Sequence, residues 1–418
     1  MKKKTDQSED QEVKTGFDYK NFEKEAIRGL SEGRDLIGKD GVLTGLIQRI
    51  VNAALEGELD GQLANDRKGG RKNRRNGHTS KQLDTSLGTV GIRPPRDREG
   101  RFRPQIVGKW DRQLGTGLDE QILSMYSLGN SVSDIQQQLQ QIYGLEYSAG
   151  SISMVTERVM EELLSWQQRP LASMYVIVYL DAIHFKIRED GHVQTRAIYT
   201  VFGVDVNGMR DVLGLYLGEH EGVHHWGRIL EDLQKRGVEE IIFCCVDGLK
   251  GFGDAIQQVY PLAIVQRCII HMVRTSVRFV GYNDLKKVCA DLRKIYSAAE
   301  IKQAEMALEV FEQTWSKKYK EIAPAWRANW TELMMFMQFG KEIRRAIYTT
   351  NAVEALHRQM RKATKTKGAW VNPKSLLKQL YLNLRFNTKG WKKNVFNWAP
   401  IQRELIEVFG NRYTKHLQ

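Results

Sequence analysis

The sequence predicts an α/β fold in which helices flank a mixed β-sheet. Two continuous apolar runs, Met174–Leu180 and Glu240–Val246, are typical of strands buried on both faces. Val193–Val206 and Met209–Gly218 alternate apolar and polar residues, and they meet at Asn207-Gly208, which is a strong hairpin signal. Helical patterns separate the later strands, so the sheet should combine antiparallel and parallel pairs.

The remaining elements of this region follow in order. Helices are expected at Val223–Gly237 and Phe252–Tyr260, with a third short apolar strand at Leu262–Ile270. Residues 282–345 lose the strand pattern and are rich in Trp and Met, which predicts an all-helical insertion with these side chains in its core. Further helices are predicted at Ala352–Lys365, at Pro373–Phe386 and from Ile401.

The N-terminal part has a different pattern. Residues 1–35 predict a charged arm with a short helix, and apolar residues at helical spacing predict an amphipathic helix over 40–64. Residues 66–112 are rich in Gly, Arg and Pro and predict an extended basic module with one strand, Leu87–Ile92. Three helices with glycine-containing turns then fit a helix-turn-helix whose recognition helix is Ser148–Val159, although any small helical domain has a similar pattern. Their expected ranges are Asp119–Leu128, Ser131–Tyr143, stopped at Gly144, and Ser148–Leu164.

Composition excludes several classes of protein. The chain has 418 residues, 63 Lys and Arg against 50 Asp and Glu, and four cysteines, too few for a disulfide scaffold. The first residues, MKKKTDQSED, contain no apolar segment typical of a signal peptide. The longest apolar runs are too short to cross a bilayer. We therefore expect a soluble, cytoplasmic, multidomain protein without a membrane partner.

The positive charge is concentrated in two segments. Residues 67–112 hold 14 Lys and Arg against four acids, and residues 355–393 hold 11 against none. Solvated faces or a disordered arm could explain such runs, but this concentration favours contact with a polyanion. Aromatic residues in or beside the segments could stack on bases, which favours nucleic acid. They are Trp110, Trp370, Phe386 and Trp391.

Two predicted buried strands end in aspartate, at Asp181 and Asp247. Carboxylates at the carboxyl ends of neighbouring strands would lie close together, where α/β sheets place their chemistry. Mutual repulsion at that distance favours a divalent cation, and oxygen ligands suit Mg²⁺ or Mn²⁺. Taken singly, each residue could equally be a structural aspartate in a turn.

A third carboxylate would be needed to hold two ions, and Glu354 is the best candidate. It opens a predicted helix on which Arg358 and Arg361 share its face, as a phosphodiester site requires. Asn351 and Glu354 also read as a capping box, an interpretation compatible with the first. Glu342 is the alternative third acid.

Two metal-like patterns carry less weight. His220-Glu221-Gly222-Val223-His224 matches the zinc-protease pattern, but glycines make it a strand-to-helix turn rather than a continuous helix. Cys268-x-x-His271 resembles half of a zinc site, and no second pair stands at zinc-finger spacing.

Several stretches resemble the Mutator-type transposases of bacterial insertion sequences. They are YLDAIHFKIRE around Asp181, the block from Trp226 to VDGLKGF around Asp247, QRCIIHMVR, YTTNAVEALHRQMRKATKTKGAW around Glu354, and the N-terminal RRNGHTSKQLDTSLGTVGIRPPRDR. Together they cover nearly the whole chain in the order of the family.

The resemblance implies an RNase H-like core with a DDE triad, here Asp181, Asp247 and Glu354, holding two Mg²⁺ or Mn²⁺ ions. It places the family's C-x₂-H signature, Cys268 and His271, beside the active site. The implied activity is binding of terminal inverted repeats in double-stranded DNA, strand cleavage and strand transfer, by a homodimer or larger assembly at the bacterial nucleoid. The alternatives are a catalytically silent DNA-binding protein derived from a transposase, or a nuclease acting on junctions or hybrids.

These expectations divide the chain into seven parts and name a set of DNA contacts. The parts are 1–65 (arm and amphipathic helix), 66–115 (basic module), 116–169 (helix-turn-helix-like domain), 170–280 (first part of the core), 281–345 (helical insertion), 346–393 (second part of the core) and 394–418 (C-terminal helix). The expected DNA-binding residues are Arg71, Lys72, Arg74, Arg75, Arg93, Arg96, Arg98, Arg358, Arg361, Lys362, Lys365 and Lys367.

Overall fold

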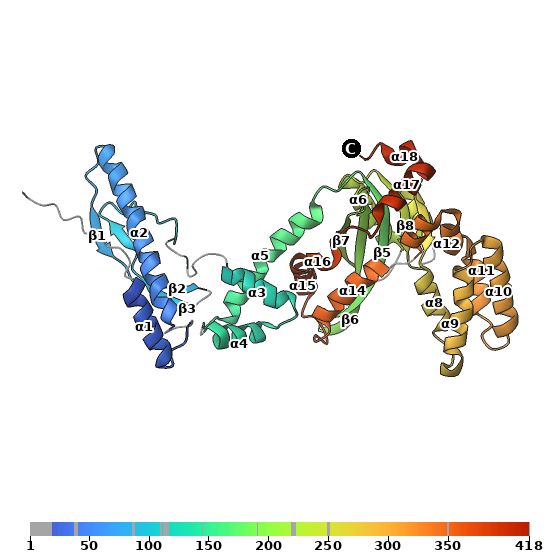
Figure 1. The fold of residues 1–418 in the computed structure, drawn as a ribbon, viewed down its shortest axis with the longest axis horizontal. Coiled ribbons are helices and arrows are strands. Elements are labelled where there is room, and N and C mark those ends of the chain that lie inside the picture. Colours follow the sequence, from blue (N-terminus) through green and yellow to red (C-terminus); the bar gives the residue numbers. More distant parts are fainter. Residues whose placement is uncertain are drawn as a thin grey trace, which may run out of the picture. The chain divides into compact units, whose positions relative to one another are not determined.

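The structure is a computed structural model, and its chain divides into two compact units. It describes residues 19–36, 41–85, 88–108, 111, 117–143, 145–189, 191–218, 223–248, 251–348 and 351–417. The first unit comprises Met1–Met125 and Asn130–Val155, and the second comprises Tyr126–Gly129 and Thr156–Gln418 (Figure 1). None of the helices in these ranges is both long and apolar enough to cross a membrane.

In the first unit, a long helix packs against short strands. The helix predicted over 40–64 is confirmed as α2 (Val42–Lys68), and it ends where Gly70 adopts φ +76°, a left-handed conformation that favours glycine. The region after it has more regular structure than the one predicted strand. The elements are α1 (Tyr19–Ser31), β1 (Arg75–His78), β2 (Lys81–Thr85), β3 (Gly88–Ile92) and β4 (Pro95–Asp97).

The strands form two small antiparallel sheets, β1 with β4 and β2 with β3. Leu83 of β2 and Val90 of β3 pack on Val51 and Leu55 of α2. Alternate residues of both strands are buried in this contact, a period that the many Gly and Arg residues hide in the sequence. The apolar stripe of α2 is therefore largely covered within its own chain, although Ile50 is exposed. Leu87, the predicted first residue of β3, lies outside the described residues.

The three helices predicted after the basic module are present. They are α3 (Gly117–Ser127), α4 (Val132–Tyr143) and α5 (Ala149–Gln168). Ser131 Oγ accepts a hydrogen bond from the Asp134 amide, and Ser148 Oγ accepts one from the Ser151 amide, so both serines cap the helices that follow them. The helix-turn-helix assignment stays a prediction, and Gly144 lies outside the described residues.

The second unit contains the predicted mixed sheet. Its order is β7-β6-β5-β8-β9; β5 is antiparallel to β6, as is β6 to β7, whereas β8 is parallel to both β5 and β9. The hairpin at Asn207-Gly208 is confirmed, with Gly208 at φ +79°. The strands are β5 (Met174–Glu189), β6 (His192–Asp205), β7 (Arg210–Gly218), β8 (Glu240–Val246) and β9 (Ile264–Arg267).

Two strand predictions were wrong at their ends. The first strand does not stop at Asp181, because β5 continues to Glu189 as one arm of its long hairpin with β6. The strand predicted over Leu262–Ile270 is only Ile264–Arg267, because the chain turns at Cys268 into helix α8 (Ile269–Val277). The predicted helix ends agree more closely, at α6 (Val223–Lys235) and α7 (Phe252–Val259).

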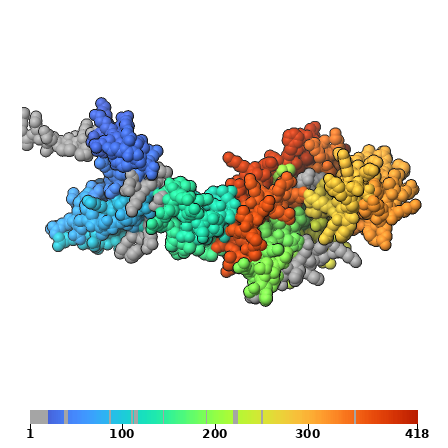
Figure 2. Space-filling view, turned by 90° about the horizontal axis from the view of Figure 1, so that it is seen from below, coloured from blue at the N-terminus to red at the C-terminus, as the bar shows by residue number. Residues whose placement is uncertain are grey.

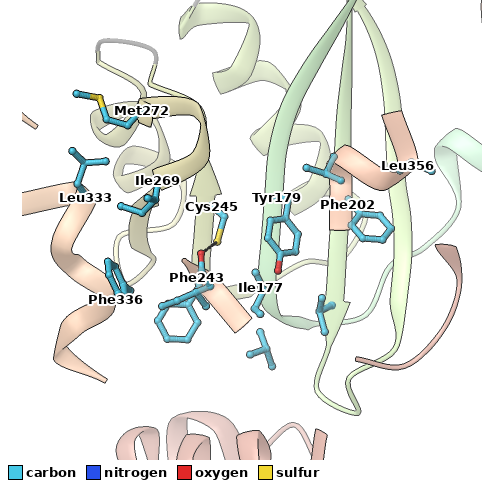
Figure 3. Close-up of a cluster of buried hydrophobic side chains, with 14 of the residues drawn as sticks. Ile177, Tyr179, Phe202, Phe243, Cys245, Ile269, Met272, Leu333, Phe336 and Leu356 are labelled. Atoms are coloured by element: carbon cyan, nitrogen blue, oxygen red, sulfur yellow. Dashed lines mark hydrogen bonds between the residues drawn. The ribbon is translucent and has the colours of Figure 1, made fainter. Parts of the chain in front are cut away.

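Each face of the sheet is covered by its own apolar cluster. On one face, Val178, Leu180 and Cys244 pack with side chains of α6 and α7, including Trp226. On the other face, Ile177, Tyr179 and Phe243 pack with helices from later in the chain. Figure 3 shows this second cluster, in which the Cys245 thiol donates to the Ile347 carbonyl at 3.4 Å.

Residues 282–345 are helical as predicted, and several of their aromatic side chains belong to the second apolar cluster. Trp326 is fully buried and its Nε1 donates to Ser276 Oγ at 2.9 Å. Figure 2 shows the yellow and orange residues of this region gathered into one group. Its helices are α9 (Tyr282–Tyr296), α10 (Ile301–Trp315), α11 (Ile322–Ala328), α12 (Trp330–Met334), the 3₁₀ turn η1 (Met335–Gln338) and α13 (Lys341–Ile347).

Helix α14 (Asn351–Thr364) returns the chain to the sheet. Its buried stripe, Val353, Leu356 and Met360, belongs to the second apolar cluster. Gly129 (φ +105°) lies so close to α14 that an added Cβ would stand 2.2 Å from the Ala363 carbonyl oxygen, so only glycine fits there. The chain ends with α15 (Pro373–Phe386), α16 (Thr388–Trp391), α17 (Trp398–Phe409) and α18 (Asn411–Thr414).

Candidate active site

The sheet brings Asp181 and Asp247 to the same edge of two neighbouring strands. In the parallel pair of β5 and β8, the last partners in register are Leu180 and Val246, so each aspartate is the next residue along its strand direction. Side chains alternate between faces along a strand, so Asp181 shares the face of Tyr179 and Ile183, the face on which α14 packs. Although Asp181 does not end its strand, the predicted proximity of the two carboxylates is present.

His271 joins the two carboxylates. Ligand atoms of Asp181, Asp247 and His271 all lie within 4.8 Å of one another. Cys268 is the N-cap residue of α8, and His271 lies in the first turn of that helix, so the C-x-x-H stretch forms the junction between β9 and α8. The Nδ1 atom of His271 lies 3.9 Å from Asp247 Oδ1.

The environment shifts the pKa values of these groups. Burial raises the pKa of Asp181 to about 6, and the negative charges of Asp247 and Glu354 add to the increase. A hydrogen bond with Cys268, together with the nearby carboxylates, raises the pKa of His271 to about 9 against the effect of burial. A cationic imidazole thus partly balances two crowded carboxylates.

A second histidine, His357 of α14, also lies close to Asp181. Its Nδ1 lies 3.4 Å from Asp181 Oδ2, and its Nε2 lies 3.1 Å from Thr200 Oγ1. Burial, with the positive charge of Arg361, lowers the pKa of His357 to about 3, so its ring is neutral and the contact is not an ion pair. With its proton on Nδ1, the ring can donate toward Asp181 and accept from Thr200.

Glu354 lines the same cavity as Asp181, and Glu342 does not. Arg274 of α8 holds Glu354 in a two-point ion pair, with Nη1 to Oε1 at 2.7 Å and Nη2 to Oε2 at 2.9 Å. Glu342 instead borders a separate cavity of about 220 Å³ beside Tyr179 and Arg210. The first cavity measures about 460 Å³ and is lined by Asp181, Ala182, His271, Arg274, Glu354, His357, Arg358 and Arg361.

The residues present fit a divalent cation. The Nδ1 atom of His271 is buried and has no hydrogen-bond partner within the described part of the chain, and it faces two carboxylates. A buried polar atom without a partner is costly unless a ligand satisfies it. Carboxylates suit Mg²⁺ or Mn²⁺, and an imidazole ligand would have to lose its proton on binding.

The cations predicted on α14 and beyond differ in their surroundings. Arg358 and Arg361 are exposed in the cavity, and among the described residues no carboxylate pairs with either. Lys362 and Lys365 are also exposed, the former beside a second cavity. Lys367 is held between the rings of Tyr126 and Trp370 and donates to Gln379 Oε1, so its charge has protein partners.

The predicted DNA-contacting cations of the first unit fall into two groups, those that form ion pairs within the chain and those that are exposed. Arg75 pairs with both Glu56 and Asp60, and Arg71 lies 3.6 Å from Asp66. The other predicted contacts, Lys72, Arg74, Arg93, Arg96 and Arg98, are exposed.

The aromatic part of the nucleic-acid prediction was wrong for two residues. Trp370 is 3% exposed and Trp391 is 7% exposed, so both belong to the core and cannot stack on bases. Trp110, with Lys109 and Arg112, lies outside the described residues, as do His220–Gly222 of the zinc-protease pattern and the Asn351 side chain of the capping box.

Sequence reasoning missed the ion pair of Arg274 with Glu354 and the buried environment of His357. Arg274 follows His271 by three residues, so one face of α8 carries both, and this spacing could have drawn attention to it. His357 follows Glu354 by three residues on α14, but no local pattern shows that it would be buried against Thr200 of β6.

Comparisons with known proteins agree with one another. The sequence model of the family described as "Transposase, Mutator family" matches residues 20–394. The probable transposase for insertion sequence element ISRM3-like of Sinorhizobium fredii is 39% identical over 94% of this chain and 99% of that protein. The transposase for IS905 of Lactococcus lactis is 31% identical over 77% of this chain and 81% of that protein.

Among solved structures, the Drosophila P element transposase strand transfer complex aligns over 71% of this chain and 87% of that chain. The TM-score is 0.29 and the identity is 9%, a likeness too slight to support an argument about the fold.

Proposed function

The chain belongs to the Mutator family of transposases, and from this membership we propose that it cleaves and joins DNA at Asp181, Asp247 and Glu354. The observation that carries this proposal is the cluster of Asp181, Asp247 and His271 within 4.8 Å, with Glu354 lining the cavity to which Asp181 and His271 belong. As a transposase of the insertion-sequence type, the protein acts on DNA.

We further propose that the second unit is an RNase H-like core. In support, a five-stranded mixed sheet carries the two aspartates on its adjacent parallel strands, and the acid predicted to complete the triad follows a helical insertion. The seven-part division of the chain given above is part of this proposal.

Transposases need divalent metal ions, and we propose two Mg²⁺ or Mn²⁺ ions, held by Asp181, Asp247 and Glu354 with His271 as a further donor. When bound, such ions lower the pKa of an attacking water or 3′-hydroxyl and neutralise charge on the leaving oxygen. The acids must be ionised for this, so at neutral pH the raised pKa of Asp181, about 6, still leaves most of its molecules charged.

The other side chains of the cavity orient the reactants. Neutral His357 fixes Asp181 by a contact that adds no charge to the site. Arg358 and Arg361 offer fork-shaped donors that match the geometry of phosphate oxygens, and we assign them to the backbone of the DNA strand being cut.

The exposed cations of the first unit, with helices α3–α5, are proposed to recognise the terminal inverted repeats. Their contacts with phosphates would position the duplex, whereas a helix in the major groove would read the sequence. Cleavage at two ends of one element calls for a homodimer or larger assembly on nucleoid DNA.

The test compares three proteins on one substrate. Wild type, Glu354→Gln and Glu342→Gln are each incubated with labelled DNA carrying the inverted repeats that flank this gene, in Mg²⁺ and then in EDTA. Metal-dependent nicking at the repeat boundary by wild type and Glu342→Gln, but not by Glu354→Gln, is the expected result. Specific binding without cleavage by all three would favour the alternative, a catalytically silent DNA-binding protein.

A further inference from the structure

Arg274 and Glu354 form an ion pair that conflicts with a metal-binding role for Glu354. Both carboxylate oxygens of Glu354 accept hydrogen bonds from the Arg274 guanidinium, at 2.7 and 2.9 Å. A guanidinium that donates to both oxygens takes one lone pair of each, and its positive charge disfavours a divalent cation on the lone pairs that remain. Binding of a metal ion by Glu354 is therefore favoured by release of Arg274.

The surroundings of Arg274 allow this release. Its side chain is 58% exposed, whereas that of Glu354 is 15% exposed, so Arg274 is the partner that has room to leave the contact. Arg358 and Arg361 line the same cavity. A released Arg274 guanidinium would therefore join two other arginines at a surface suited to phosphate.

We propose that Arg274 is a positioning residue that exchanges partners during the reaction. Before metal binds, it holds the Glu354 carboxylate in the cavity and compensates its charge. Once Glu354 binds a divalent ion, Arg274 passes to a phosphate of the DNA substrate. Metal and DNA then bind with positive coupling, and each raises the affinity for the other by the same factor. This inference rests on the proposed metal-binding role of Glu354.

The first experiment titrates the full-length protein with Mn²⁺ by calorimetry in the absence of DNA. Arg274→Gln removes the competitor for Glu354, so we expect it to bind Mn²⁺ about three- to tenfold more tightly than wild type. Arg274→Lys keeps the charge but loses the two-point grip, and its affinity should lie between the two. Arg278→Gln, one helical turn further along and outside the cavity lining, should match wild type.

The second experiment measures binding of a labelled DNA duplex by fluorescence anisotropy, in EDTA and in Ca²⁺, which takes oxygen ligands as Mg²⁺ does. Added Ca²⁺ should raise the DNA affinity of wild type more than that of Arg274→Gln. Arg278→Gln should again behave as wild type.

Three outcomes would overturn the proposal. Arg274→Gln could bind Mn²⁺ no more tightly than wild type. Arg274→Lys could match wild type while Arg274→Gln binds more tightly, which would mean that only net charge matters. Equal gains in DNA affinity from Ca²⁺ for wild type and Arg274→Gln would show that Arg274 does not couple the two ligands.

Glu354→Gln separates failure of this inference from failure of the proposed function. If Glu354→Gln binds Mn²⁺ as tightly as wild type, the metal-binding role of Glu354 is wrong, and the exchange falls with it. If Glu354→Gln binds Mn²⁺ more weakly but Arg274→Gln is unchanged from wild type, the metal site stands and only the exchange is refuted. Thermal unfolding of each variant establishes that it is folded.

Discussion

Strand β8 carries a carboxylate at each end, and the two have opposite surroundings. At its start, Glu240 pairs with Arg412 and, at 3.4 Å, with Lys415. Just beyond its other end, Asp247 lies 3.9 Å from His271 and close to a second carboxylate, and no Lys or Arg in the described ranges forms an ion pair with it. The charge of Glu240 is matched by two cations of the chain, whereas that of Asp247 is balanced only in part, by a histidine that it shares with Asp181.

We expect this difference to distinguish structural charges from those proposed to be functional. The Asp247 side chain is 44% exposed, so water can hydrate its charge and its oxygens stay accessible to a ligand. The same distinction applies to the cations: Lys378 is 5% exposed and bound to Glu157, whereas Arg358 and Arg361 are exposed in the cavity. The predictions below test whether matched and unmatched charges behave differently.

The largest effect is expected when each of the two carboxylates at the ends of β8 is replaced by an amide. Asp247→Asn should lower the cleavage rate at least about 100-fold, because it removes charge that would bind metal, while DNA affinity is retained. Glu240→Gln should leave cleavage intact and lower the free energy of unfolding by about 1 kcal/mol, because Arg412 loses its partner. Cleavage assays, DNA binding and thermal unfolding distinguish the two. Residual cleavage by Asp247→Asn above about one percent of wild type would contradict the role assigned to this acid.

The cations of the cavity should give the next largest effect. The double variant Arg358→Gln, Arg361→Gln should weaken DNA binding about tenfold at moderate salt and leave thermal unfolding almost unchanged, because these exposed charges are proposed to contact phosphate. Lys378→Gln should leave DNA affinity almost unchanged and lower the stability of the fold. The substitution removes the ion pair with Glu157 and puts an amide without that partner at a buried position. Equal loss of DNA affinity in both proteins would show that position in the cavity does not matter.

Within the first unit, a smaller contrast is expected. Substituting Arg93, Arg96 and Arg98 together by Gln should reduce the slope of log affinity against log salt by about 2 to 3, as each phosphate contact contributes roughly 0.9. Arg75→Gln should change this slope little, because Glu56 and Asp60 already match its charge. Anisotropy titrations across a salt series provide both slopes. A flat salt response of the wild type would contradict the nucleic-acid role of the basic segments.

The smallest effect is a pH dependence at Glu240. Burial raises the pKa of Glu240, but hydrogen bonds and ion pairs with Arg412 and Lys415 outweigh burial and lower it. A carboxyl whose folded-state pKa is lowered contributes stability above its unfolded value, about 4.5, and loses it as pH falls through the folded value. The difference in unfolding free energy between wild type and Glu240→Gln should therefore shrink below pH ~4. A constant difference from pH 7 down to pH 3.5 would indicate a packing effect instead.

Local sequence patterns predicted most of the helices and strands, because a helix or strand with one buried face has apolar residues at regular intervals. The runs that became β5 and β8, the hairpin at Asn207-Gly208 and the helix Pro373–Phe386 were all recognisable from period and turn chemistry. Strand ends were less predictable: whether β5 stops at Asp181 depends on its pairing with β6, which is not a local property.

The proximity of Asp181 and Asp247 was predictable from the sequence, whereas the partners of the surrounding charged residues were not. The sequence predicted that Asp181 and Asp247 lie close together, because neighbouring parallel strands have their carboxyl ends at the same edge of a sheet. Whether a cation is matched depends on residues distant in sequence, such as Glu56 for Arg75 or Glu157 for Lys378. A basic segment in the sequence therefore overstates the charge that is available to DNA, and a tryptophan beside it, such as Trp391, can be entirely structural.

The helical insertion separates the second acid from the third along the chain. During synthesis on the ribosome, Asp181 and Asp247 emerge early, whereas Glu354 emerges only after α9–α13 have been made. With Glu354 as the third acid, a nascent or prematurely terminated chain holds two carboxylates and no complete site. If Glu354 completes the site as proposed, a chain gains the ability to cut DNA only after residue 354 of its 418 residues has been made.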